Sequence, residues 1–272
     1  MKRFSASTAL TRVALSVALA ASATAAHATH SWGTYHWARQ LNPFTLKLGN
    51  NLSSGWQSYF GTTISDWSQS SELNLTSVAG GTRPKNCRPT AGRVEVCNAS
   101  YGNTGWLGVA SISITGGTHI TQGAAKMNDT YFNTATYNTT AWRNLVMCQE
   151  VGHTFGLGHV DENFSNANQN TCMDYTSDPS TNQHPNNHDY EQLTLIYSHL
   201  DGTTTVGAAI PSATPPAMND IDFAGPAQWG RVVKEARDGR WQIYELDFGG
   251  GHKVVTHVLW AIGHERGRGI ER

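Results

Sequence analysis

The chain is best interpreted from residues 148–159, which read C-Q-E-V-G-H-T-F-G-L-G-H. A helix over the first part of this stretch presents Gln149 and His153 on one face, because residues four apart lie side by side, and Glu150 is next to them. Gly156 can adopt the left-handed conformation that ends a helix, so the chain can fold His159 back toward the same point. The stretch therefore predicts two metal ligands on a helix, a third after it, and a carboxylate beside them.

Three converging ligands suit a catalytic zinc ion, because they leave its fourth coordination position open for water. Glu150 is placed to take the proton from that water, which a zinc ion makes a usable nucleophile near neutral pH. The competing interpretation is an ordinary core helix followed by a Gly- and His-rich loop, with His153 as a core histidine. The combination of Glu150 with the returning His159 favours the metal centre.

This stretch resembles the motif of the metzincin zinc endopeptidases, H-E-x-x-H-x-x-G-x-x-H followed by a methionine turn. The residues at the family's positions are Glu150, His153, Gly156 and His159. Gln149 stands where the family has its first histidine. Residues 171–175, T-C-M-D-Y, are similar to the methionine turn, with Met173 in the place of the residue under the metal. Tyr175 matches the additional tyrosine ligand of the astacin and serralysin branches.

The resemblance implies an α+β fold with a metzincin-like catalytic domain. This domain would have a twisted, mostly parallel sheet with an antiparallel edge strand, an active-site helix, the methionine turn and a C-terminal helix. In the family, peptide substrates dock on the edge strand by strand addition, which here implies residues 106–114. The predicted strands are 44–48, 73–78, 93–97, 105–114 and 120–127. The predicted helices are 52–67, one that begins near Thr139, and a closing helix with an Asp189/Gln192 capping box.

The resemblance also implies the residues of the site. Gln149, His153 and His159 would bind Zn²⁺, and Glu150 would be the general base. Tyr175 would assist as a displaceable ligand or as a donor to the oxyanion. An amide oxygen is a weaker zinc donor than imidazole, so Gln149 is either a weak ligand or the mark of a site that has lost its metal. Asp161 is a less favoured substitute, because it lies beyond the third-ligand position.

These implications predict a zinc-dependent endopeptidase that acts on protein or peptide substrates. The alternative is a catalytically silent metzincin-like protein that holds peptide or glycan and has a degenerate metal site. Gln149 supports the silent protein, whereas the presence of Glu150 supports the enzyme. His184 and His188 lie in a polar segment and could bind a second metal, but a solvated loop is the favoured interpretation.

The N-terminus predicts secretion or export to the periplasm. A basic start is followed by a small, apolar run over residues 13–26 and an A-H-A cleavage site, so residues 1–28 read as a signal peptide. Residues 29–205 would form the catalytic domain, 206–220 a Pro-containing linker, and 221–272 a small β-rich C-terminal appendage. No later run is apolar enough to span a bilayer.

Four cysteines in a secreted chain predict two disulfides. Three pairings are possible, and the favoured one joins Cys87 to Cys97 and Cys148 to Cys172. A structural zinc site built from cysteines is disfavoured because no C-x-x-C spacing occurs. The formal net charge of −1, with 14% charged residues, gives no basic field for nucleic acid. We expect a monomer whose partner is its substrate.

Overall fold

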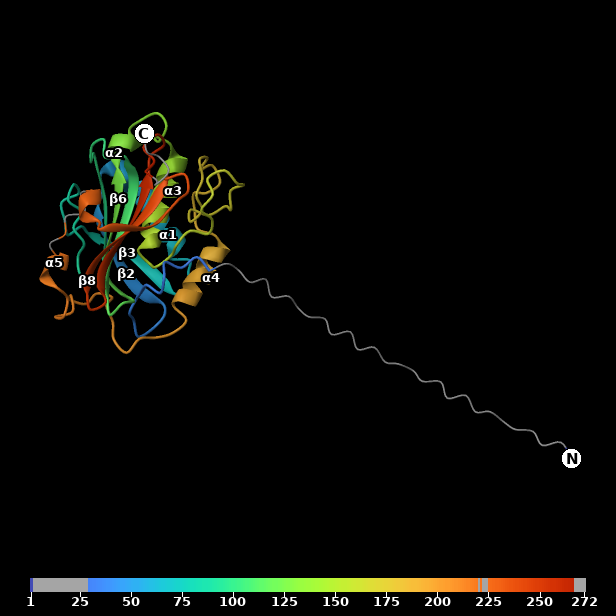
Figure 1. Ribbon diagram of the computed structural model, residues 1–272, viewed down its shortest axis with the longest axis vertical. Helices are drawn as coiled ribbons and strands as arrows, with labels where there is room; N and C mark the ends of the chain where they lie inside the picture. Colours follow the sequence, from blue (N-terminus) through green and yellow to red (C-terminus); the bar gives the residue numbers. More distant parts are fainter. Residues whose placement is uncertain (2–28, 220, 222–224, 267–272) are drawn as a thin grey trace.

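The computed structural model describes Met1, residues 29–219, residue 221 and residues 225–266 (Figure 1). Apart from Met1, the predicted signal peptide over residues 1–28 lies outside the described residues. The chain has an α+β fold with one large mixed sheet and few helices. Within the described ranges, no helix has the length and apolar character needed to cross a membrane.

The sheet joins a parallel half to an antiparallel half. Its strands are β1 His36–Trp37, β2 Phe44–Asn51, β3 Leu73–Ala79, β4 Val94–Ala99, β5 Trp106–Thr115, β6 His119–Asn128, β7 Arg231–Glu235, β8 Trp241–Gly249 and β9 His252–Trp260. They follow the order β3-β2-β4-β6-β5-β9-β8-β7, and β1 pairs with β6. The pairs among β1, β2, β3, β4 and β6 are parallel, and every pair made by β5, β7, β8 or β9 is antiparallel. All five predicted strands are present.

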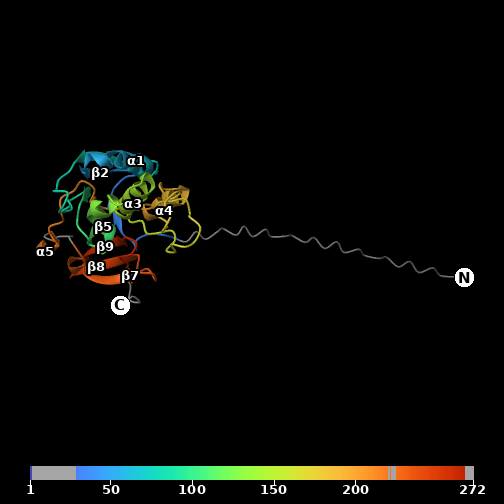
Figure 2. The same cartoon turned by 90° about the horizontal axis from the view of Figure 1, so that it is seen from above.

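The helices lie mainly on one side of the sheet. They are α1 Gln57–Trp67, α2 Asp129–Phe132, α3 Thr140–His153, α4 Asn187–Ile196 and α5 Pro216–Asn219, with 3-10 turns at Ser54–Trp56 and Pro226–Gln228. Figure 2 shows α1, α3 and α4 on the opposite side of the molecule from β7 and β8. Helix α3 begins as predicted, because the Thr139 hydroxyl accepts a hydrogen bond from the Trp142 amide at 3.2 Å.

Two hydrophobic clusters cover the two faces of β5. The larger one packs the sheet against α1 and α3, and from β5 it includes Leu107 and Ile112. The smaller one includes Trp106 and Val109 of β5 together with residues of β8, β9 and the chain before them. Because side chains alternate along a strand, a strand that is buried on both faces reads as a continuous apolar run. The second face of β5 therefore needs a covering layer.

Met218, Ile221 and Trp229 contribute to this layer, and the C-terminal strands continue the same sheet. The sequence predicts a separate appendage over residues 221–272, but β9 pairs with β5 from Trp106↔Trp260 to Ile114↔Lys253. Strand β5 is thus an interior strand, and the prediction of an antiparallel edge strand over residues 106–114 is wrong. The physical reason is that β9 satisfies the backbone hydrogen-bonding groups along the otherwise open edge of β5. Met218, in the predicted linker, is also buried in the smaller cluster.

Helix α4 begins one turn earlier than its predicted capping box. Asn186 is the N-cap, and its side chain accepts from the Asp189 amide, while the Asp189 carboxylate accepts from the Asn186 amide at 2.7 Å. Asp189 is therefore the third residue of the box and not its first. Gln192, the predicted partner, instead accepts a hydrogen bond from the His30 amide at 2.9 Å.

Both favoured disulfide pairings are confirmed. One bond joins Cys87 to Cys97, and the other joins Cys148 of α3 to Cys172 in the turn after it. No described cysteine is free. Two disulfides are compatible with an extracellular protein.

The turn after α3 generates a first testable prediction. Gly156 has a φ of +92°, and a Cβ there would lie 2.1 Å from the Tyr35 carbonyl oxygen. We expect Gly156→Ala to lower the free energy of unfolding by about 2–5 kcal/mol, since the left-handed conformation and the overpacking both cost energy. Gly102→Ala is the matched control, because Gly102 has a φ of +84° and open space around it. Urea unfolding that gave equal losses for both variants would contradict this explanation.

Candidate metal centre

The end of α3 brings the histidines of the motif together. His153 is the last residue of α3, and the chain turns at Gly156 before it returns to His159. The two imidazole rings have centroids 4.5 Å apart. The turn is fixed by the N-terminal segment, because the Trp32 amide donates to the Gly156 carbonyl at 2.6 Å.

A third histidine, His257 of β9, completes the group. The ligand nitrogens of His153, His159 and His257 all lie within 4.8 Å of one another. The His257 ring centroid is 4.2 Å from that of His153 and 4.9 Å from that of His159. Sequence reasoning missed His257, because its only signal was an inward position in the alternating run Val255, His257, Leu259.

Gln149 is buried beside this group, and its amide is partly engaged. Its nitrogen donates to the Cys172 carbonyl at 2.9 Å. Its oxygen is buried and has no hydrogen-bond partner among the described residues. The Gln149 side chain therefore keeps one free acceptor. The predicted ligands were Gln149, His153 and His159, and the fold adds His257 to them.

Two imidazole nitrogens of this group have no hydrogen-bond partner among the described residues. His153 Nδ1 is 2.8 Å from the Leu157 carbonyl, so Nδ1 carries the proton and Nε2 keeps its lone pair. Nε2 of His153 and Nε2 of His159 are buried and have no hydrogen-bond partner among the described residues. Buried polar atoms are rarely left unpaired, and metal-binding histidines typically have their second nitrogen held in this way. The three histidines thus fit a zinc ion.

Glu150 lies directly against the group. Its Oε2 is 3.2 Å from His257 Nδ1, whereas its Oε1 has no partner within the described part of the chain. Gly108 of β5 makes room for it, because a Cβ at Gly108 would lie 2.5 Å from Glu150 Oε1. Even a methyl side chain at position 108 of β5 would therefore collide with the Glu150 carboxylate.

Burial keeps these groups neutral in the absence of a cation. It lowers the pKa of His153 and of His257 to about 3 and that of His159 well below its ordinary value. Burial also raises the pKa of Glu150 to about 8, and His153 opposes that shift. Neutral imidazole is the form that binds metal. A bound cation would favour the ionised form of Glu150, because opposite charges stabilise each other.

The turn that resembles the methionine turn packs under α3 and against His257. Met173 is fully buried, and a Cβ on Gly152 of α3 would lie 2.8 Å from its sulfur. The Tyr175 hydroxyl is 2.8 Å from His257 Nε2, and the Tyr175 ring stacks on His159 with centroids 3.7 Å apart. Burial raises the pKa of Tyr175 well above its ordinary value, so its hydroxyl keeps its proton.

A small cavity connects the three histidines to the surface. Its volume is about 240 Å³, and its lining includes His153, His159, His257, the residues 29–33 and Trp241. Glu162 and Lys234 also line it and form an ion pair with each other. The cavity has room for a side chain or a short chain end, but not for an extended strand.

The remaining sequence candidates lie elsewhere. The Asp161 carboxylate accepts from the Asn163 amide at 2.6 Å and belongs to no metal-binding group of the described residues. His184 pairs with Asp66 at 2.7 Å, and His188 lies 3.9 Å from Glu191. Neither histidine belongs to a metal-binding group of the described chain, in keeping with the favoured interpretation of a solvated loop over a second metal site.

The pKa shifts predict how stability depends on pH in metal-free protein. Between about pH 5 and 6.5, the unfolded chain protonates the three site histidines, whereas the folded chain does not. Glu150 acts in the opposite direction, because it binds a proton only when folded. We expect the free energy of unfolding to fall on acidification by about 1.4 kcal/mol per pH unit for each net proton. His257→Gln should reduce this slope. Equal slopes for His257→Gln and the parent protein would contradict the assignment.

In comparisons with known proteins, no family model and no curated protein sequence matches the chain. The structure shows an α+β protein with two disulfides and a group of three histidines that could hold a metal ion.

Proposed function

We propose that this protein is a secreted, metzincin-like zinc endopeptidase that hydrolyses peptide bonds. The observation that carries the proposal is the meeting of His153, His159 and His257 beside Glu150, with the Nε2 atoms of His153 and His159 buried and unpaired. A zinc ion bound there supplies the Lewis acidity that makes water a nucleophile near neutral pH. In this proposal His257 replaces Gln149 in the ligand set that the sequence motif implies.

The neighbouring side chains have separate roles. Glu150 accepts the proton of the attacking water through its unpaired Oε1 and passes it to the leaving amine. Its Oε2 accepts from His257 Nδ1, which orients both side chains and leaves His257 Nε2 without a proton. With His257 Nε2 on the zinc, the Tyr175 hydroxyl that lies 2.8 Å from this nitrogen, held protonated by its burial, would be released as a donor for the oxyanion of the tetrahedral intermediate.

The position of β9 limits how a substrate reaches this centre. The side of β5 on which a peptide would dock by strand addition is already paired with β9. The substrate therefore enters through the cavity beside Glu162, Lys234 and Trp241, which admits a short group. We expect the enzyme to prefer unfolded chains or exposed chain ends over compact folded proteins.

A second candidate function is the catalytically silent binding protein. The observation that favours it is the same occupied edge of β5, together with a Glu150 that is fully buried and bonded to His257. In this alternative the histidines are structural, and the chain binds peptide or glycan elsewhere on its surface. The two functions differ in whether Glu150 is needed for hydrolysis.

The activity of Glu150→Gln separates them. The amide keeps the shape of the carboxylate but cannot accept the proton, so we expect hydrolysis of an unfolded protein substrate to fall by about 10²–10⁴-fold. Zinc content should stay at the parental value, which distinguishes loss of the base from loss of the metal. Glu191→Gln, on the exposed face of α4, is the control. A parental rate in Glu150→Gln would remove the enzyme proposal.

Zinc retention tests the identity of the third ligand. We expect His257→Gln to lose zinc at a chelator concentration at least about 100-fold lower than the parent. The substitution removes a metal ligand itself, and not a residue that only orients a ligand. Gln149→Met should shift the chelator midpoint little, since the three histidines remain. The reverse order of the two variants would show that the amide oxygen of Gln149 is the third ligand.

A further inference from the structure

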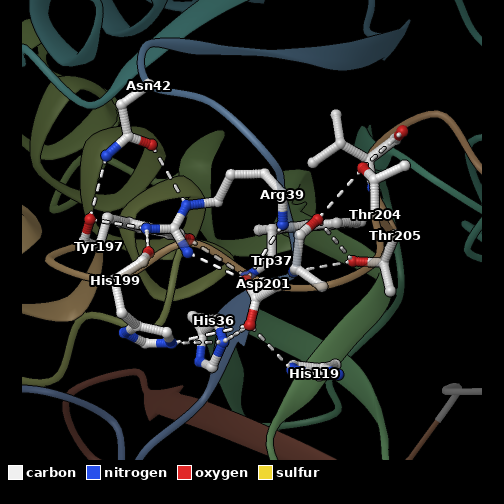
Figure 3. Close-up of polar contacts among 12 residues, drawn as sticks. His36, Trp37, Arg39, Asn42, His119, Tyr197, His199, Asp201, Thr204 and Thr205 are labelled. Carbon is white, nitrogen blue, oxygen red and sulfur yellow. Dashed lines mark hydrogen bonds and ion pairs between the residues drawn. The ribbon is translucent and has the colours of Figure 1, made fainter.

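A second histidine cluster lies away from the candidate centre (Figure 3). The Nε2 atoms of His36, His119 and His199 all point at Asp201 Oδ1, at 3.3, 3.2 and 3.7 Å. His199 Nε2 is also 3.3 Å from His36 Nε2. These residues come from β1, the start of β6 and the chain after α4, and none belongs to the first centre.

The spacing of these atoms matches the coordination shell of zinc. Zinc binds histidine nitrogen and carboxylate oxygen at about 2.0–2.2 Å in a tetrahedron, whose edges are then roughly 3.3–3.5 Å. The three nitrogen–oxygen distances and the one nitrogen–nitrogen distance run from 3.2 to 3.7 Å, at or near these edges.

The hydrogen bonds around the cluster orient its potential ligand atoms. His36 Nδ1 lies 2.9 Å from the Thr34 carbonyl, which leaves Nε2 as the ring nitrogen that faces Asp201. The other oxygen of Asp201, Oδ2, accepts from the Arg39 guanidinium at 3.0 Å and from the Arg39 amide at 3.1 Å. Oδ1 is thereby turned toward the three imidazoles, so that one carboxylate oxygen and three ring nitrogens converge on one point.

We propose that His36, His119, His199 and Asp201 form a structural zinc site. Three imidazoles and one carboxylate favour zinc over calcium or magnesium, which prefer oxygen ligands. Four protein ligands close the coordination shell, as in structural sites, so no reaction is expected there. The ion would tie β1 and the start of β6 to the chain after α4. A cavity of about 520 Å³ lined by the four ligand residues gives it a path from solvent.

The test counts zinc per chain in the purified full-length protein after equilibration with zinc and removal of weakly held metal. We expect the double variant His119→Gln/His199→Gln to hold one zinc fewer than the parent and to lose the part of the thermal stabilisation that this ion gives. Both side chains are partly exposed, at 31% and 54%, so their replacement leaves the core intact. His184→Gln, an exposed histidine outside both clusters, should keep the parental count.

The two centres are distinguished by their own variants. His153→Gln/His257→Gln should lose the zinc of the first centre and keep that of the second. An equal zinc count in the parent and in His119→Gln/His199→Gln would overturn the proposal and leave an ion-paired network around Asp201. Should the double variant fail to fold, anomalous diffraction at the zinc edge from parental crystals decides: a peak among the four side chains supports the site, and no peak there overturns it.

Discussion

The pairing of β5 with β9 is the constraint on which the candidate centre depends. It sets Ala110 of β5 opposite His257 of β9, and this register points His257 at Glu150 and His153 of α3. A shift of one residue would turn His257 to the other face of the sheet, because side chains alternate along a strand. The same pairing satisfies the backbone groups along this edge of β5, so the stability of the sheet and the assembly of the centre depend on one contact.

Burial explains the chemistry of the group. Three imidazoles and a carboxyl group packed away from water are held neutral, which prepares the histidines for a metal and leaves Glu150 uncharged without one. The unpaired nitrogens of His153 and His159 cost stability in the metal-free protein, and a bound cation would relieve that cost. The ring of Tyr175, stacked on Trp241 of β8, covers one side of the group.

What the sequence predicted correctly is local. The start of α3 at Thr139, the turn at Gly156, the strands of the first half and both disulfides follow from caps, glycine conformation, alternation and cysteine arithmetic. The family resemblance and the proteolytic activity that it implies stay predictions. The position of β9 could not be predicted, because no local pattern tells one alternating segment which strand it joins. His257 could therefore not be predicted as a site residue. The cluster around Asp201 could not be predicted either, because Asp201 lies 165 residues from His36 in the sequence.

The central claim is that a strand from the end of the chain supplies the third ligand to a motif that lacks its first histidine. The most direct measurement is a crystal structure of the zinc-loaded protein with an anomalous map at the zinc edge. The account requires an ion within about 2.0–2.1 Å of one nitrogen each of His153, His159 and His257. An ion bound by the Gln149 oxygen with His257 turned away, or no ion among the three histidines, would contradict it.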